Sequence, residues 1–336
     1  MSKPNQIEVI ASDSNRCGEG PIWDAEKQRL LWTDIESALV YEFTEPERRS
    51  PDRRGGAAIK PADLEIGAPH AGPYEENKQI ISRGLTVSGI GLNRTGELIF
   101  CGAGGLHLWR GQDDFRTVVS LHENVKLSLN DMSVDPQGRV YAGMLHWGAN
   151  GLEKLGTLYL INCDGSVRIV DEGIELSNGL GFSPDNRTLF FSDSSARQIY
   201  AYDVNPTTGD LSNKRSFVQV PNEEGIPDGL TVDAEGFVWS AQWFGSQVVR
   251  YDPSGKVERR VKFPVTQISS VAFGGKDLNE LYVTSAADGW GNSPCFPTGF
   301  DAKAGNWGGD LYRVKTDIQG RVEYKASFVG DAVTSL

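Results

Sequence analysis

Histidine and cysteine, the residues that most often hold zinc and other soft metals, are scarce in this chain of 336 residues, with four of each. The cysteines have none of the short spacings of zinc sites, so we expect free buried thiols rather than a disulfide framework. They are Cys17, Cys101, Cys163 and Cys295. A metal site built on soft ligands is therefore disfavoured.

Positive charge and long apolar runs are also lacking. The chain has 33 lysines and arginines against 45 aspartates and glutamates, a formal net charge of −12, which argues against nucleic acid or an anionic membrane as a partner. No run of about 18 apolar residues is present, and the start, MSKPNQIEV, contains no secretory hydrophobic segment. We therefore expect a cytoplasmic protein that binds neither nucleic acid nor membranes.

Several catalytic motifs are missing as well. The sequence contains no G-x-S-x-G nucleophile elbow, no H-E-x-x-H zinc motif and no phosphate-binding loop. Serine hydrolases, zincins and nucleotide-dependent enzymes consequently lack support.

What the sequence does contain is a short pattern that recurs six times: a polar residue, an apolar-small-apolar run and a turn. After a longer first interval the copies are roughly 40–50 residues apart, and each is followed by a second strand rich in aromatic and β-branched residues. The first residues of the six copies, which we call the head residues, are Glu19, Ser88, Asn130, Asn178, Asp228 and Ser269. This period, with several short strands per unit, is typical of a β-propeller. We predict an all-β fold in which residues 1–336 form a single six-bladed β-propeller domain.

Three segments stand outside the repeat. Residues 44–79 are rich in proline, glycine and charge, so we expect a surface insertion in the first blade, with a tolerated insertion favoured over a lid or an oligomer contact. Residues 288–310 are long enough to help roof the channel, where Trp290 and Phe296 would offer a sugar-stacking face. The strand predicted at Ile7–Ser12 is expected to pair with the last blade and close the ring.

The head residues form the candidate functional site. The inner strands of a propeller run the same way along the central axis, so residues at the same register meet at one mouth of the channel. Two carboxylates and two amide oxygens would converge there, which is unfavourable unless a cation binds them. Oxygen ligands favour one hard divalent cation, Ca, Mg or Mn, with Zn or Fe as alternatives.

Each head residue also has a structural interpretation. Asn or Asp before Gly is common turn chemistry, which is the alternative for Asn178 and Asp228. Glu19 is the least turn-like of the six and is favoured as a ligand. Ser88 and Ser269 are expected to be small residues that line a narrow channel.

The chain resembles the gluconolactonase/regucalcin/luciferin-regenerating-enzyme family in four stretches, which are CGEGPIW, SNGLGFSPDNRTLFFSDS, PDGLTVDAEGFVWSA and AFGGKDLNELYVTSAADG. The resemblance spans nearly the whole chain. It implies a six-bladed propeller that holds one divalent cation at the channel mouth and hydrolyses a sugar-acid lactone. Carried over by motif, it implies that Glu19, Asn178 and Asp228 are the metal ligands and that Asn130 lies in the substrate pocket.

Two departures from this family concern the pocket. Ser128 stands where the family's lactonases often have an arginine, two positions before Asn130. The segment GMLHWG places His146 and Trp147 where acidic residues often follow. We therefore predict that Ser128, His146 and Trp147 contact the substrate, and that the preferred lactone differs from gluconolactone.

The expected chemistry follows from such a site. A cation with three protein ligands keeps positions open for the lactone carbonyl and a water. We expect Asp228 to be both a ligand and the general base that accepts the proton of that water, and Asn130 to help stabilise the oxyanion. The one partner predicted is a small sugar lactone, and the oligomeric state stays open. Two alternatives remain: a phosphotriesterase or arylesterase with the same metal site, and a non-catalytic metal-binding propeller.

Overall fold

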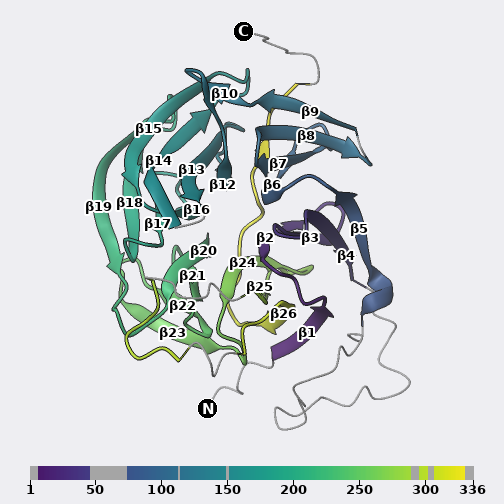
Figure 1. Ribbon diagram of the computed structural model, residues 1–336, viewed down its shortest axis with the longest axis vertical. Coiled ribbons are helices and arrows are strands. Elements are labelled where there is room, and N and C mark those ends of the chain that lie inside the picture. Colours follow the sequence, from purple (N-terminus) through teal and green to yellow (C-terminus); the bar gives the residue numbers. More distant parts are fainter. Residues whose placement is uncertain are drawn as a thin grey trace.

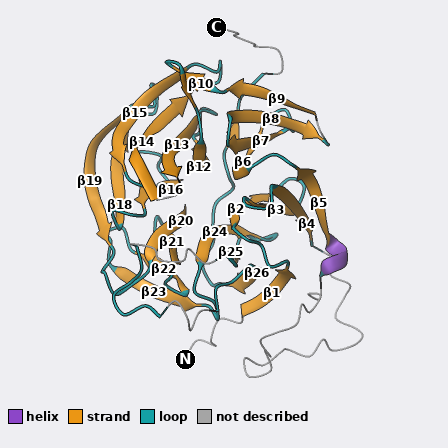
Figure 2. Cartoon of the chain, in the orientation of Figure 1, coloured by secondary structure: helices purple, strands orange, loops and turns teal. Residues whose placement is uncertain are grey.

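The computed structural model describes residues 7–45, 74–112, 114–148, 151–288, 295–301 and 306–329. Within these ranges the chain consists of β-strands, turns and one single-turn 3-10 helix, Glu75–Asn77 (Figure 2). Five antiparallel four-stranded sheets and one five-stranded sheet, in which β27 adds a parallel strand to an antiparallel set of four, stand around a central axis (Figure 1). This arrangement confirms the predicted all-β, six-bladed β-propeller.

Each blade is one sheet, whose strands follow one another from the channel outward. Blade 1 contains β2 (Gly18–Asp24), β3 (Arg29–Asp34), β4 (Leu39–Thr44) and β5 (Lys78–Arg83). Blade 2 contains β6 (Val87–Asn93), β7 (Leu98–Gly102), β8 (Gly105–Gly111) and β9 (Asp114–Val119). Blade 3 contains β12 (Leu129–Val134), β13 (Val140–Gly148), β14 (Gly151–Ile161) and β15 (Val167–Ile174), preceded by a hairpin of β10 (Leu121–His122) and β11 (Val125–Lys126).

The second half of the ring repeats this order. Blade 4 contains β16 (Ser177–Phe182), β17 (Thr188–Asp193), β18 (Gln198–Val204) and β19 (Leu211–Gln219). Blade 5 contains β20 (Ile226–Val232), β21 (Val238–Trp243), β22 (Gln247–Tyr251) and β23 (Val257–Lys262). Blade 6 contains β24 (Ile268–Gly274), β25 (Glu280–Ser285), β26 (Asp310–Lys315) and β1 (Ile7–Ser12).

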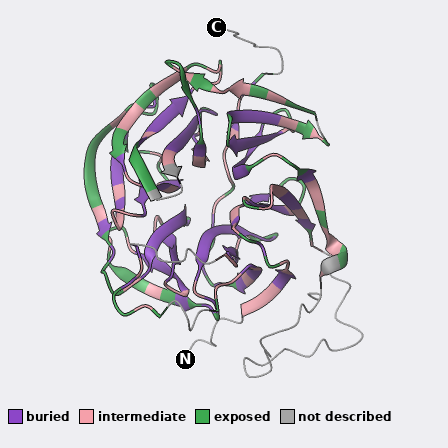
Figure 3. Ribbon diagram, viewed as in Figure 1, coloured by how far each residue is buried: buried purple, intermediate pink, exposed green. Residues whose placement is uncertain are grey.

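Burial falls from the channel outward along each blade (Figure 3). The second strands β7, β21 and β25 are buried at every position, because their aromatic and β-branched residues pack between neighbouring blades. Outer strands such as β19 are largely exposed. The core is therefore a series of apolar layers between adjacent blades, and the polar head residues stand at its inner edge.

The glycines after two head residues are required by close packing between inner strands. Gly179 and Gly229 lie within β16 and β20, so neither Asn178 nor Asp228 occupies a turn. A Cβ at Gly179 would lie 2.3 Å from the backbone nitrogen of Leu230 in the next blade. The turn interpretation of these Asn-Gly and Asp-Gly pairs is therefore wrong, and the small residue serves contact between blades.

The N-terminal strand closes the ring, as predicted. β1 pairs antiparallel with β26, with Ile7 opposite Val314 and Ser12 opposite Asp310. Ile10 is 1% exposed and belongs to the apolar cluster between blades 6 and 1. Closure pairs a strand from one end of the chain with strands from the other, so β1 completes blade 6 as its outermost strand.

The C-terminal segment crosses the other mouth of the channel after β26 (yellow in Figure 1). The backbone of Gln319 accepts a hydrogen bond from Ala234 in blade 5, and Arg321 donates to the carbonyl of Phe182 in blade 4 over 2.9 Å. Strand β27 (Lys325–Ala326) then pairs in parallel with β6 in blade 2. The segment therefore links blades 5, 4 and 2 across this mouth of the channel.

Most of the predicted insertion, residues 46–73 of 44–79, lies outside the described residues. At its start, Thr44 ends β4 and Glu45 accepts from the Tyr282 hydroxyl over 2.9 Å. At its end, the chain leads from Tyr74 through the 3-10 helix into β5, and the Tyr74 hydroxyl donates to Glu8 over 2.6 Å. No helix within the described ranges is long and apolar enough to cross a bilayer.

Candidate metal centre and substrate cavity

Four of the six head residues line one cavity of about 330 Å³ at the channel mouth. They are Glu19, Asn130, Asn178 and Asp228. The other residues around this cavity are Arg16, Cys17, Ile35, Glu36, Leu145, Leu176, Ile226, Trp243 and Asp288. Four blades therefore deliver a polar side chain into the same space, as the repeat register predicts.

A register irregularity at the head position recurs in all six inner strands. In blade 1 the pairing of β2 with β3 shifts between Glu19 and Ile22, and in blade 5 the pairing of β20 with β21 shifts between Pro227 and Leu230. The other four blades show shifts at the corresponding positions. Such bulges redirect a side chain, which here turns the head residue away from its own sheet.

Three head residues donate hydrogen bonds to the backbone of the next blade. Ser88 donates to the carbonyl of Leu129 over 2.9 Å, and Ser269 donates to the carbonyl of Gly18 over 2.5 Å. In each case the acceptor directly precedes the head residue of the next blade. Both serines are buried, so they join blades at the inner edge and do not line the cavity.

Asn130 follows the same rule and also contacts another head residue. Its Nδ2 donates to the carbonyl of Ser177 over 2.8 Å and to Oδ1 of Asn178 over 2.6 Å. Both amide hydrogens are thus in use, which leaves none for an oxyanion. In this arrangement Asn130 offers the cavity the acceptor Oδ1, whereas the expected role toward an oxyanion would need a donor.

The remaining heads, Glu19, Asn178 and Asp228, make no such donation to the next blade. Asn178 is held by Ser194, whose Oγ accepts from Nδ2 over 2.7 Å, so Oδ1 is the atom turned toward Asn130 and the cavity. Glu19 accepts the backbone N–H of Gly20 over 3.1 Å. These three residues can therefore present oxygen atoms to a ligand.

Three buried carboxyl groups in this region, Glu19, Asp131 and Asp228, have raised pKa values. Burial, with a contribution from Asp131, raises the pKa of Glu19 to about 8. Burial and the nearby carboxylates of Glu19 and Asp131 raise the pKa of Asp228 well above its ordinary value, and burial raises the pKa of Asp131 to about 6. In the described part of the chain, no lysine or arginine forms an ion pair with any of the three.

This donor set fits a hard divalent cation. No three His, Cys, Asp or Glu side chains in the described ranges are placed to hold a metal ion, so a complete ligand set here needs an amide oxygen. Glu19 and Asp228 supply negative charge without a protein counter-ion, and Asn178 supplies a neutral oxygen. Carboxylate and amide oxygens are the ligands that Ca²⁺, Mg²⁺ and Mn²⁺ prefer.

The residues around the rim are partly charged and partly apolar. Arg16 lies 2.7 Å from Asp288 and 3.9 Å from Glu36, so two acidic side chains already neutralise its guanidinium. Ile226 and Trp243 form an apolar wall continuous with the aromatic cluster that includes Phe244. The cavity lining is thus polar and acidic at the head residues and apolar along Ile226 and Trp243.

Comparison with known proteins identifies the chain's relatives. The sequence profile of the SMP-30/Gluconolactonase/LRE-like region matches residues 17–287. The chain belongs to this family. It is 33% identical over 319 residues to pentonolactonase XacC of Haloferax volcanii, an alignment that covers 94% of this chain and 97% of the relative.

Other members of the SMP-30/gluconolactonase/LRE-like family agree in sequence or fold. Regucalcin of Gallus gallus is 32% identical over 290 residues, covering 84% of this chain and 88% of the relative. A luciferin-regenerating enzyme superposes with a TM-score of 0.78 at 25% identity, covering 96% of this chain and 99% of that one. A calcium-binding regucalcin from Agrobacterium tumefaciens has a TM-score of 0.76 at 22% identity, covering 96% and 97%, and supports the fold.

Two of the residues at which this family member departs from the pattern, Ser128 and His146, are not among the residues that line the cavity. Ser128 is exposed, pairs with Ala103 in an isolated bridge and is not among the residues that line the cavity. His146 is half-buried opposite Lys154, and burial together with that lysine lowers its pKa. The side chain of Trp147 lies outside the described residues. Their roles toward the substrate remain proposals.

The segment 288–310 is only partly described. Trp290 lies outside the described residues. Phe296 packs against Phe244 with ring centroids 4.8 Å apart and against Phe300 at 4.9 Å. Phe296 therefore supports the apolar wall beside Trp243 from behind.

Sequence reasoning missed several residues that shape this site. Asp131 directly follows Asn130 and raises the pKa of Glu19, a signal that was visible in the motif NDMSVD. Ser194 orients Asn178, and the apolar wall at Trp243 had no distinguishing motif. Their roles depend on which strand ends meet, which a repeat pattern alone does not specify.

Proposed function

We propose that the protein is a metal-dependent carboxylic ester hydrolase that opens a sugar-acid lactone. The observation that carries the proposal is the convergence of Glu19, Asn178 and Asp228 in one cavity at the mouth of a propeller of this family. Among the described residues no lysine or arginine forms an ion pair with either carboxylate, and Asn178 turns an oxygen toward the same space. The relatives named as lactonases support lactone hydrolysis as the reaction.

In this proposal Glu19, Asn178 and Asp228 hold one divalent cation, which would polarise the lactone carbonyl and lower the pKa of a water. Asp228 accepts the proton of the attacking water with a carboxylate oxygen that faces the cavity. The water oxygen joins the carbonyl carbon, the ring carbon–oxygen bond breaks, and the ring oxygen leaves as a hydroxyl after taking up a proton. The product is the open hydroxy acid.

The remaining residues bind and orient the substrate. Asn130 Oδ1 accepts a hydrogen bond from a sugar hydroxyl or from the attacking water, because its amide hydrogens are already used. Trp243 and Ile226 cover the apolar face of the sugar ring and exclude bulk water. Ser128, His146 and Trp147 would contribute to substrate choice at the periphery.

The rim favours a neutral lactone. Arg16 is the one basic side chain among the described residues that line the cavity, and Asp288 and Glu36 already pair with it. Four acidic side chains line the same space, and one divalent cation would offset only part of their charge. A phosphorylated or carboxylated lactone would thus meet net negative charge at the mouth, so we propose an uncharged aldonolactone as the substrate.

The test is a pH-indicator hydrolysis screen on protein stripped with chelator and reloaded with Ca²⁺, Mg²⁺, Mn²⁺, Zn²⁺ or Fe²⁺. The panel contains glucono-δ-lactone, pentono-γ-lactones, paraoxon and phenyl acetate. We expect lactone turnover that depends on the added cation. Faster turnover of paraoxon or phenyl acetate would favour the phosphotriesterase or arylesterase alternative, and cation binding without turnover would favour the non-catalytic propeller.

A matched control separates the site from the ring. Glu19→Gln should abolish cation-dependent turnover, whereas Ser88→Ala changes another head residue, which joins blades and lies outside the cavity. Equal loss of activity in both variants at unchanged fold would contradict the assignment.

A further inference from the structure

Two buried aspartates occupy the same place in two different blades. Asp34 ends β3 opposite Gly18, the residue before Glu19. Asp193 ends β17 opposite Ser177, the residue before Asn178. Their exposed fractions are 2% and 3%. Neither residue lines the cavity, and neither has a role in the chemistry proposed above.

The Asp34 carboxylate receives two backbone N–H groups from the loop that enters its inner strand. Asp34 Oδ2 accepts from the nitrogen of Arg16 and Oδ1 from that of Cys17, both over 3.0 Å. These donors are the third and second residues before Glu19, which is a candidate metal ligand.

The Asp193 carboxylate makes the same pair of bonds in blade 4. Asp193 Oδ2 accepts from the nitrogen of Glu175 over 3.1 Å, and Oδ1 accepts from that of Leu176 over 2.9 Å. Glu175 and Leu176 are again the third and second residues before a candidate ligand, Asn178.

The other four blades have no aspartate at this position. By strand register the equivalent residues are Gly102, Met144, Gln242 and Ser285. Gln242, in the blade that carries Asp228, bonds instead to Tyr251 and Gln247. The aspartates are therefore confined to the two blades whose head residues are Glu19 and Asn178.

The loop itself closes without a carboxylate. The same backbone hydrogen bond recurs in blades 1, 4 and 6. Its donor is the N–H of the residue that follows the aspartate position, and its acceptor is the carbonyl of the second residue before the head residue. The three bonds are Ile35 N to Cys17 O, Ser194 N to Leu176 O and Ala286 N to Gln267 O. Blade 6 makes this bond with Ser285 in place of an aspartate. The propeller thus does not need the carboxylate to form the turn. The two aspartates must therefore have a function that is specific to blades 1 and 4.

We propose that Asp34 and Asp193 are positioning residues that fix the strand entries of Glu19 and Asn178 so that both side chains meet one cation. The inference rests on the proposed function insofar as that function supplies the cation. Each aspartate clamps two consecutive N–H groups with two oxygens, which removes the freedom of the loop just before the ligand. The same clamps place Cys17 and Leu176 in the cavity wall.

The test measures cation affinity rather than activity. Full-length protein, stripped with chelator, is titrated with Ca²⁺ and with Mn²⁺ in a calorimeter for wild type, Asp34→Asn, Asp193→Asn and Asp34→Ala. Each Asn variant keeps one acceptor oxygen and turns an amide toward the second N–H group, so we expect affinity to fall about 10–100-fold, the range for residues that orient metal ligands. Asp34→Ala keeps no acceptor and should lose more.

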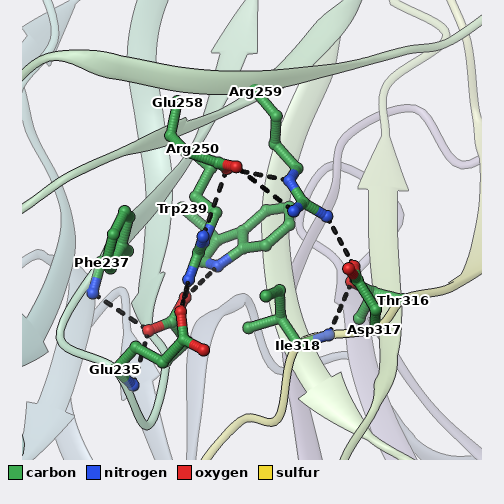
Figure 4. Close-up of polar contacts among 10 residues, drawn as sticks. Glu235, Phe237, Trp239, Arg250, Glu258, Arg259, Thr316, Asp317 and Ile318 are labelled. Atoms are coloured by element: carbon green, nitrogen blue, oxygen red, sulfur yellow. Dashed lines mark hydrogen bonds and ion pairs between the residues drawn. The ribbon is translucent and has the colours of Figure 1, made fainter. Parts of the chain in front are cut away.

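Asp233→Asn is the matched control. Asp233 is also fully buried and accepts the backbone N–H groups of Glu235 and Phe237, but it lies at the opposite end of an inner strand, in the blade that carries Asp228. Its Oδ2 accepts from Nε of Arg250 over 2.9 Å, and Arg250 belongs to the polar network shown in Figure 4. We expect Asp233→Asn to lower the melting temperature while the cation affinity stays within about twofold of wild type.

The outcomes separate this inference from the proposed function. Unchanged cation affinity in folded Asp34→Asn and Asp193→Asn, or an equal loss in Asp233→Asn, would overturn the positioning role. If a variant folds poorly, hydrogen exchange at the amides of Arg16, Cys17, Glu175 and Leu176 supplies a second measurement: exchange there no faster than in wild type would also overturn it. Wild type that binds the cation but hydrolyses no lactone would contradict the proposed function alone.

Discussion

Nδ2 of Asn130 donates to Oδ1 of Asn178 over 2.6 Å, so two neighbouring blades share one hydrogen bond inside the cavity. The same Asn130 amide donates to the carbonyl of Ser177, which anchors it to the backbone of blade 4. Ser194 holds the other end of the Asn178 amide. The orientation of Asn178 is thus specified from both sides, and its oxygen is turned toward the cavity before any ligand arrives.

This relationship predicts the effect of Asn130→Ala. Removing the amide frees Asn178 and removes the acceptor that we assign to the substrate, so kcat/KM should fall about 10–100-fold. Calorimetry should still find one cation per chain, because Glu19, Asn178 and Asp228 remain. Complete loss of cation binding would instead make Asn130 a metal ligand and contradict its assignment to the substrate.

Asp228→Asn tests the general base. An amide keeps the shape and a coordinating oxygen but does not accept the proton of water, so turnover at saturating cation should fall about 10²–10⁴-fold. The measurement is kcat with cation well above the Kd of the variant, which separates catalysis from affinity. Full kcat in the cation-saturated variant would refute the role as base.

The raised pKa values predict how pH acts on the stability of the cation-free protein. Glu19 has its pKa raised from 4.5 to about 8, so between these values the folded state keeps a proton that the unfolded state has released. Stability then falls as pH rises through this window. The pKa of Asp131 is raised to about 6 and that of Asp228 is raised as well, so both groups also lower the stability as pH rises.

Melting curves between pH 5 and 8.5, with chelator and with saturating cation, check this prediction. With chelator the melting temperature should decline with pH, and with cation the decline should vanish because the bound ion stabilises the ionised carboxylates. Glu19→Gln removes one titrating group and should make the decline shallower. A melting temperature that rises with pH in chelator would contradict the prediction.

The repeat pattern predicted the ring, its closure by residues 7–12 and the convergence of four head residues, because propeller geometry converts equal register into equal position. It did not predict the hydrogen bonds of Asn130, since the direction of an amide depends on the bulge and on the neighbouring blade. Asp34 was visible at the end of RLLWTD, but its bonds to a loop 17 residues earlier arise only in the folded sheet. The family motif marks position 128 as a departure but carries no information on burial, and Ser128 is exposed because it stands just before β12 begins.

Because β1 closes the ring, we expect Ile10→Ala to destabilise the protein. Ile10 is 1% exposed in the strand that completes blade 6, so the cavity left behind should lower the free energy of unfolding by about 2–5 kcal/mol. Ile7, half-buried on the same strand, is the control, and Ile7→Ala should cost less. Urea unfolding measures both, and an equal effect in the two variants would argue against closure through a buried β1.

The last prediction concerns which lactone is preferred. Leu145 lines the cavity from β13, and His146 and Trp147 follow it in the chain. Ser128, two residues before Asn130, is exposed. A serine in place of an arginine removes a permanently charged fork suited to several sugar oxygens, so shape and apolar contact must do more of the selection. One methylene in such a pocket is worth about 10–200-fold in discrimination. We therefore expect a pentonolactone or another neutral lactone to exceed D-glucono-δ-lactone in kcat/KM.

A panel of γ- and δ-lactones measured for wild type, Leu145→Ala, Ser128→Arg and Trp147→Ala tests this specificity. Leu145→Ala enlarges the cavity and should raise the relative kcat/KM of the larger, six-carbon lactones. Ser128→Arg brings a long cation toward an acidic rim and should improve anionic lactones relative to neutral ones. Val322→Ala, exposed on the segment that crosses the other mouth, should leave the ranking unchanged. If gluconolactone is the best substrate of wild type and the ranking is the same in all variants, this account of substrate choice is wrong.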